Sequence, residues 1–282
     1  MNKSFIYRLV EKFIDKKFFA ETWYNYLTGE WHTPFPPELE GYKGIMDRQR
    51  RFFSHFPSEP HCYECGKPMA GFWGRFMGST PSSFSPKLCN SCEQGVRLFS
   101  AGAELELTMI FADVRDSTPL AELNGPSVFK DIINRFYKET SKVLIEHNAM
   151  VNRLMGDQVI ALFAPRFVGK NHAKVALHAT QELLRVTGHG DSNGPWVPVG
   201  AGLHTGTAYV GAVGSPDGVN EIAVLGIAPT LCARLSSKAA AGEILISEDS
   251  VKYGNLDVAG LESRSLELKG ISQPVSVRVM KM

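Results

Sequence analysis

Two short apolar runs, one followed by an aspartate and one interrupted by an aspartate, constrain this chain more than any other feature. The run at residues 107–111 (LTMIF) is typical of a buried strand and leads directly to Asp113. A second run at residues 152–163 is broken by Gly156 and Asp157, which predict a tight turn between two strands. Carboxylate oxygens of this kind suit Mg²⁺ or Mn²⁺. We therefore predict a divalent metal site at Asp113 and Asp157, although aspartates in turns can also be purely structural.

A helix start follows the first aspartate. Thr118 and Pro119 are typical of an N-cap and a first helical position. The unpaired backbone amides of a helix N-terminus bind phosphate readily. We therefore predict that Ser117 and Thr118 contribute to a phosphate site beside Asp113.

A third segment, GAGLHTGTAYVGAVG, is followed by AVLGIAPTLCARLSS. Together with FADVRDST, RLMGD, GEILIS and LKGI, these segments occur in a familiar order and spacing. From about Glu104 onward, the chain resembles the catalytic domain of the class III nucleotidyl cyclases, the family of adenylate and guanylate cyclases.

The resemblance implies that a nucleoside triphosphate, most commonly ATP, is converted to its 3′,5′-cyclic monophosphate and pyrophosphate. Two Mg²⁺ or Mn²⁺ ions per active site would be held at Asp113 and Asp157, with Val114 beside them. Arg234 matches the arginine that stabilises charge on the phosphate in the transition state. Lys269 matches a position that binds the terminal phosphates.

Three positions depart from the usual family pattern. Thr230 stands where an asparagine normally orients the ribose, and the base-reading positions hold Arg153 and Ala223. The Ala223 side chain cannot accept a hydrogen bond from the amino group of adenine. Two alternatives to an ATP cyclase therefore stay open: a pyrimidine cyclase that makes cyclic UMP or cyclic CMP in antiviral signalling, and an inactive nucleotide-binding or dimerisation module.

The predicted elements alternate between strands and helices. This pattern favours an α+β fold with a mostly antiparallel sheet, and the resemblance implies a ferredoxin-like core. Family active sites form between two such domains, so one copy in this chain predicts a homodimer with composite sites. We predict helices at residues 127–147, 173–186 and 228–239, a hairpin around 157, hairpin strands around 198–213, and closing strands at 244–247 and 275–279.

Four cysteines form two Cys-x₂-Cys pairs, a spacing that predicts zinc binding. A small loop-rich segment around them could hardly bury enough surface to fold alone, so the metal would be structural. An iron-sulfur or redox site is a weaker alternative. The predicted ligands are Cys62, Cys65, Cys89 and Cys92.

The segment before the cysteines carries an apolar stripe with flanking lysines, typical of an amphipathic helix. We expect a helix and an extended connector at residues 1–55, the zinc module at 56–100 and the cyclase domain at 101–282. The helix could pack on the protein or contact a membrane surface. With 30 basic and 29 acidic residues, the chain shows no global charge that favours nucleic acid. No signal-peptide pattern is present, so we expect a cytoplasmic protein.

Overall fold

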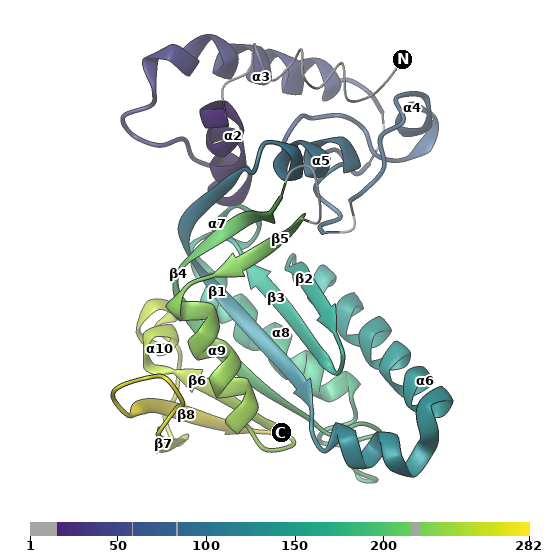
Figure 1. Cartoon of the computed structure of the whole chain (residues 1–282), viewed down its shortest axis with the longest axis vertical. Helices are drawn as coiled ribbons and strands as arrows, with labels where there is room; N and C mark the ends of the chain where they lie inside the picture. The colour runs from purple at the N-terminus through teal and green to yellow at the C-terminus, as the bar shows by residue number, and fades with distance from the viewer. Residues whose placement is uncertain (1–15, 58, 83, 216–219) are drawn as a thin grey trace. The chain divides into compact units, whose positions relative to one another are not determined.

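The computed structural model describes residues 16–57, 59–82, 84–215 and 220–282. The chain divides into two compact units. The first contains Met1–Leu105 and Tyr209–Ala223, and the second contains Glu106–Ala208 and Val224–Met282. Figure 1 labels their helices and strands.

The described residues form one sheet in the strand order β2-β3-β1-β4-β6-β8-β7, with β5 also paired to β4. The chain passes from one unit into the other within β1, β4 and β5. The strands are β1 (Gly102–Val114), β2 (Met150–Met155), β3 (Gln158–Phe163), β4 (Val199–Gly214), β5 (Asn220–Leu225), β6 (Glu243–Ser247), β7 (Glu262–Leu266) and β8 (Val275–Lys281).

The first part of the second unit has the strand order expected of a ferredoxin-like core. Helix α6 (Ser117–Glu146) connects β1 to β2, and α8 (His172–Val186) connects β3 to β4. This βαββαβ succession with the spatial order β2-β3-β1-β4 is the split βαβ arrangement.

The prediction of a mostly antiparallel sheet needs correction, because the sheet is mixed. Strands β4 and β6 pair in parallel, with α9 (Ile227–Lys238) in the connection between them. Parallel neighbours require such a crossover, since a tight hairpin can join only antiparallel strands.

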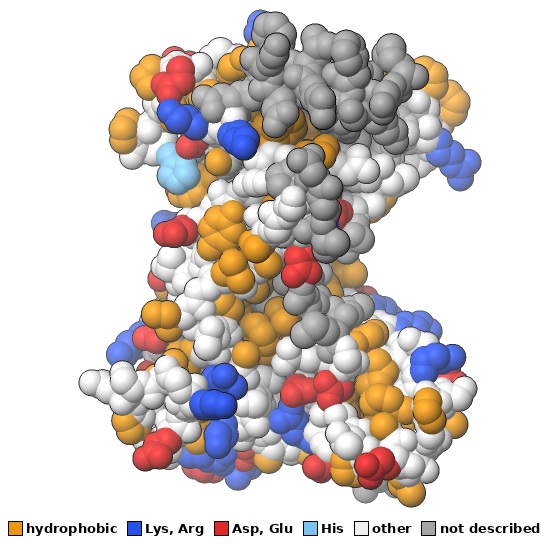
Figure 2. Space-filling view, in the orientation of Figure 1, with side chains coloured by type: hydrophobic (Ala, Val, Ile, Leu, Met, Phe, Trp, Pro, Cys, Tyr) orange, Lys and Arg blue, Asp and Glu red, His pale blue; other side chains and the backbone are white. Residues whose placement is uncertain are grey.

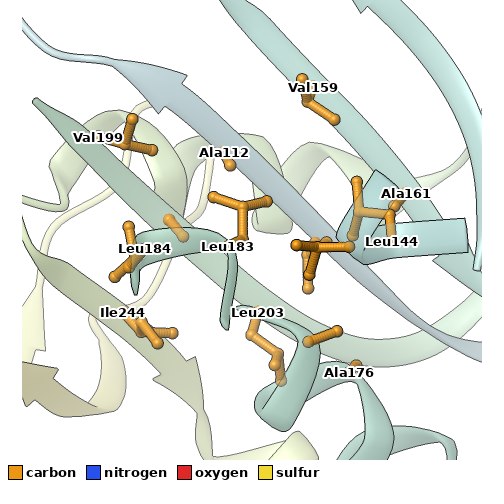
Figure 3. Packing of buried hydrophobic residues seen from close by; sticks show 14 of the residues in the cluster. Ala112, Leu144, Val159, Ala161, Ala176, Leu183, Leu184, Val199, Leu203 and Ile244 are labelled. Carbon is orange, nitrogen blue, oxygen red and sulfur yellow. The ribbon is translucent and has the colours of Figure 1, made fainter. Parts of the chain in front are cut away.

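Helices cover both faces of the sheet in the second unit. Along β6, Ile244 and Ile246 face a core shared with α6 and α8, whereas Leu245 faces a smaller core against α9. Figure 3 shows the larger core, where Leu144 of α6 and Leu183 of α8 approach the strands. The sheet therefore places α9 on the face opposite α6 and α8.

Most of the predicted helices and strands of this unit are found. Helices α8 and α9 begin and end within one residue of the prediction. The predicted helix at 127–147 is the longer part of α6, which is interrupted at Gly125 (φ 73°) before Pro126. The residues predicted as hairpin strands around 198–213 form the single strand β4, which pairs with β5. Short helices complete the unit: α7 (Pro165–Val168), a 3₁₀ turn (Gly169–Asn171) and α10 (Glu248–Gly254).

The first unit is helical where an extended connector was expected. Trp23 and Tyr26 lie three residues apart on one face of α2, are buried, and stack with ring centroids 5.0 Å apart. The Trp23 indole also donates a hydrogen bond to the carbonyl of Val210 (2.9 Å). The burial of aromatic side chains at helical spacing therefore explains why this segment is a helix and not the predicted extended connector. The helices are α2 (Lys16–Thr28), a 3₁₀ turn (Pro37–Leu39), α3 (Glu40–Phe53), α4 (Gly71–Phe76) and α5 (Asn90–Leu98).

The predicted N-terminal amphipathic helix falls mainly on residues 1–15, which lie outside the described residues, and so does its membrane contact. Among the helices that the structure describes, none combines the length and apolar character needed to span a bilayer. The proposed domain limits near residues 55 and 100 stay predictions.

Candidate active site

The register of the sheet brings the two predicted metal ligands together. Asp113 at the end of β1 lies opposite Gln158, the residue that follows Asp157. The amide of Val114 donates to the carbonyl of Asp157 (3.0 Å), which ties the end of β1 to the hairpin turn. Residues 44 positions apart in sequence thus share one corner of the sheet.

The electrostatics of this corner favour a cation. Burial raises the pKa of the Asp113 carboxyl; the nearby Asp157 carboxylate also raises it, and Arg115 lowers it. Asp113 is 22% exposed and pairs with the Arg115 guanidinium. Two neighbouring carboxylates in a partly buried position repel each other, and a divalent cation between them would remove that cost.

A tyrosine supports the turn that carries Asp157. The Tyr137 hydroxyl on α6 donates to the carbonyl of Gly156 (2.6 Å), and Gly156 has a positive φ of 65°. Burial raises the pKa of Tyr137, with a further contribution from Asp157. The tyrosine therefore stays a neutral donor and fixes the hairpin against α6.

A cavity of about 360 Å³ adjoins this corner. It is lined by Ser117 and Thr118, by Asp157 and by further residues of α6. The helix starts at Ser117, one position before the predicted N-cap, and Asp116 precedes it in a left-handed conformation (φ 53°) without a side-chain cap. Amides at this end of α6 are thus available to an anion beside the two carboxylates.

Helix α9 presents the predicted catalytic pair on its exposed side. Thr230 and Arg234 are exposed and one turn apart, whereas Cys232 and Leu235 are buried. The Thr230 hydroxyl donates to the carbonyl of Gly226 (3.0 Å), so its oxygen keeps accepting capacity only. A Cβ on Gly202 of β4 would lie 2.4 Å from the amide of Ser236. The glycine therefore allows α9 to lie directly on the strand.

The other predicted residues lie elsewhere. Lys269 is exposed in the connection between β7 and β8. Arg153 occupies β2 opposite Ile160, and Ala223 occupies β5 in the first unit. Among the described residues that line the cavity, Arg234, Thr230 and Lys269 are absent. Of the predicted metal and phosphate positions, Asp157, Ser117 and Thr118 line this cavity. Asp113 does not line it but lies next to the turn that carries Asp157.

Sequence reasoning missed two supporting residues, Tyr137 and Arg115. Arg115 lies two residues after Asp113 in FADVRDST, and its guanidinium also reaches α9. The position of Arg115 close to Asp113 in the sequence could have suggested a supporting role. Its contact with Ser236, however, joins residues 121 positions apart. Only the fold reveals that contact.

The four predicted zinc ligands converge in the first unit. Their sulfur atoms all lie within 4.8 Å of one another, with Cys62 to Cys92 at 3.9 Å and Cys65 to Cys89 at 3.7 Å. Four sulfurs at about 2.3 Å from one ion would be about 3.8 Å apart. The cluster therefore fits a tetrahedral zinc ion.

Charge on the visible face of the second unit is mixed. Figure 2 shows acidic and basic side chains interspersed there, without one extended patch of a single sign. This face therefore offers no broad basic surface to an anion.

The comparisons with known proteins identify the family of the chain. Residues 100–279 match the family model described as the adenylate and guanylate cyclase catalytic domain. The chain belongs to this family of class III nucleotide cyclases, as the sequence motifs predicted.

Sequence identity between the chain and individual relatives is low. The chain is 27% identical over 206 residues to an adenylate cyclase of Anabaena cylindrica, covering 67% of this chain and 39% of that protein. It is 27% identical over 177 residues to adenylate cyclase 1 of Rhizobium meliloti, covering 58% of this chain and 26% of that protein. The chain thus matches less than half the length of either relative.

Solved structures support the fold. The guanylyl cyclase Cya2 superposes with a TM-score of 0.56 at 24% identity, covering 63% of this chain and 92% of that one. The adenylyl cyclase CyaB from P. aeruginosa gives 0.55 at 24% identity, covering 64% and 96%. One neighbour is a guanylyl cyclase and the other an adenylyl cyclase, so the fold does not select a base.

Proposed function

We propose that this protein converts ATP to cyclic AMP and pyrophosphate. The observation that carries the proposal is the convergence of Asp113 and Asp157 beside the open N-terminus of α6. That arrangement suits a metal-bound triphosphate. Two of the relatives are named adenylate cyclases, which supports ATP.

The carboxylates of Asp113 and Asp157 would hold two Mg²⁺ or Mn²⁺ ions, with the backbone of Val114 beside them. When bound, such ions lower the pKa of a hydroxyl and offset charge on phosphate oxygens. The residues of this chain position the substrate and the metal ligands. The amides at the start of α6 orient the triphosphate, and Tyr137 holds the turn so that Asp157 keeps its place.

We further propose that the active site is composite and that the protein works as a homodimer. In one copy, the described residues that line the cavity do not include Arg234, which is exposed on α9. An arginine needed at the phosphate would come from a second copy, together with Thr230, Lys269 and the base-reading pair Arg153 and Ala223. Thr230 supplies an oxygen to the ribose in place of the amide of asparagine.

Ala223 supports a second candidate, a pyrimidine cyclase. Its methyl group gives no acceptor for the amino group of adenine. A site without a matched acceptor discriminates weakly among bases. The product would then be cyclic UMP or cyclic CMP.

A four-nucleotide assay distinguishes these proposals. The purified protein with Mn²⁺ or Mg²⁺ is supplied in turn with ATP, UTP, CTP and GTP, and cyclic products are separated by chromatography. We expect cyclic AMP as the main product; predominant cyclic UMP or cyclic CMP would support the second candidate. Binding of triphosphates without any cyclic product would instead indicate an inactive binding module.

Mixing two inactive variants tests the composite site. Asp113→Asn and Arg234→Ala each remove one half of every site in a homodimer. When the two are unfolded and refolded together at equal amounts, half the dimers are mixed and each mixed dimer has one intact site. We expect about a quarter of wild-type activity to return. Recovery of none, with mixed dimers shown to form, would overturn the composite arrangement.

We also propose that Cys62, Cys65, Cys89 and Cys92 hold a structural zinc ion. The separations between their sulfurs support this assignment. Four cysteines fill all the positions of a tetrahedral ion, as in structural rather than catalytic zinc sites.

A further inference from the structure

Arg115 joins the metal-binding corner to the helix that carries the catalytic arginine. Its Nε donates to the carbonyl of Asp113 (3.2 Å), and its Nη2 pairs with the Asp113 carboxylate. Its Nη1 reaches the carbonyls of Ser236 (3.3 Å) and Ala239 (3.5 Å) at the end of α9. All three nitrogens of one guanidinium are therefore engaged.

The geometry holds this side chain firmly. The amide of Arg115 donates to the carbonyl of Pro198 (2.8 Å), just before β4 begins, and the side chain is only 16% exposed. The last carbonyls of a helix have no donor within the helix, so a cation placed there stabilises the helix end. Arg234 lies on the last turns of the same helix, close to Ser236 in the chain.

A metal ion changes this arrangement. The carboxylate of Asp113 has two oxygens, and one already faces the guanidinium. A divalent cation at the same carboxylate competes for it, and two positive groups at such a distance repel each other. Metal binding must therefore weaken the bond from Arg115 to Asp113, while the contacts of Arg115 with α9 can persist.

We propose that Arg115 is a positioning residue that exchanges its ion pair with Asp113 for the metal and thereby couples metal binding to the position of α9 and Arg234. The inference rests on the proposed function for its effect on catalysis. Its first part, competition between Arg115 and the metal, concerns binding alone. If Arg115 had a purely structural role, its replacement would lower both the metal affinity and the activity. The proposed coupling predicts instead that replacement raises the metal affinity and lowers the activity.

The test uses Arg115→Gln in the full-length protein. Mn²⁺ binding without nucleotide is measured from the magnetic resonance signal of free Mn²⁺. Because the competing charge is removed, we expect the variant to bind Mn²⁺ about threefold tighter or more. The kcat falls about tenfold or more, because Arg234 loses its support, while KM changes little.

Two variants serve as comparison. Arg115→Lys keeps the charge beside Asp113, but a lysine cannot contact both the Asp113 carboxylate and the carbonyls at the end of α9. We therefore expect wild-type Mn²⁺ affinity with a reduced kcat. Arg185→Gln removes an exposed arginine of α8 that pairs with Glu182, and should change neither quantity. If Arg115→Gln does not fold, Arg115→Met carries the same expectations.

Amide hydrogen exchange measures the coupling between the metal site and α9 without an activity assay. In the wild type, Mg²⁺ should alter exchange at the last turn of α9, and in Arg115→Gln it should not. Unchanged or weaker Mn²⁺ binding by Arg115→Gln, or an unchanged kcat, would overturn the proposal. A wild-type protein that binds Mn²⁺ but makes no cyclic product would refute the proposed function instead, and the Mn²⁺ titration would still decide the competition.

Discussion

Replacing Asp113 by asparagine should lower cyclic nucleotide formation by about two to three orders of magnitude or more, at saturating Mn²⁺. Asparagine keeps the size of the side chain but carries no charge, so the corner shared with Asp157 loses half of its carboxylates. The fold should remain, because the amide oxygen of asparagine can still accept a hydrogen bond from Arg115, the ion-pair partner of Asp113. Product formation by chromatography and Mn²⁺ binding measure the two effects.

A matched control lies three residues away in the same motif. Asp116 is exposed at the start of α6, adopts a left-handed conformation and makes no side-chain cap. Asparagine tolerates that conformation as well as aspartate does. Asp116→Asn should therefore keep activity within about twofold. Activity of Asp113→Asn within tenfold of the wild type would rule out its role as a metal ligand.

The second large effect concerns the cysteine cluster. Cys89→Ser should abolish zinc binding and destabilise the first unit by several kcal/mol, since structural zinc supplies roughly 10–16 kcal/mol in small domains. Cys89 is fully buried and precedes α5, where its sulfur accepts a hydrogen bond from the amide of Cys92. Metal content by mass spectrometry and thermal unfolding measure the loss.

Cys232→Ala is the appropriate comparison for that variant. Cys232 belongs to the second unit, where it is buried against the carbonyls of Met109 and Gly202. Its replacement leaves a small cavity and lowers stability modestly, by about 1 kcal/mol, but should leave zinc content unchanged. Full zinc content in Cys89→Ser, or none in the wild type, would contradict the assignment.

Local patterns in the sequence predict the parts of the fold that depend on local chemistry. The strand before Asp113 and the turn at Gly156 are both found, and the register then brings the two aspartates together. The missed strand β7 (Glu262–Leu266) has the sequence ESRSL, whose few apolar residues give no alternation that predicts a strand. It is held instead by pairing with β8 at the edge of the sheet.

Other features depend on contacts distant in sequence. The aromatic residues of α2 suggest a strand or connector by propensity, but the burial of Trp23 against the carbonyl of Val210, 187 residues away, requires the whole first unit. The parallel pairing of β4 with β6 is likewise a matter of topology. No local pattern around Arg115 reveals that its guanidinium meets the end of α9.

The glycine at position 202 sets the distance between a strand and the helix that carries Arg234. Cβ positions there would fall 2.4 Å from the amide of Ser236 and 2.6 Å from the carbonyl of Cys232, both backbone atoms that cannot rotate away. Helix and strand therefore lie too close together for any side chain at this position. A single added methyl group would therefore push the helix away from the strand, and any substitution of Gly202 would displace Arg234 together with α9.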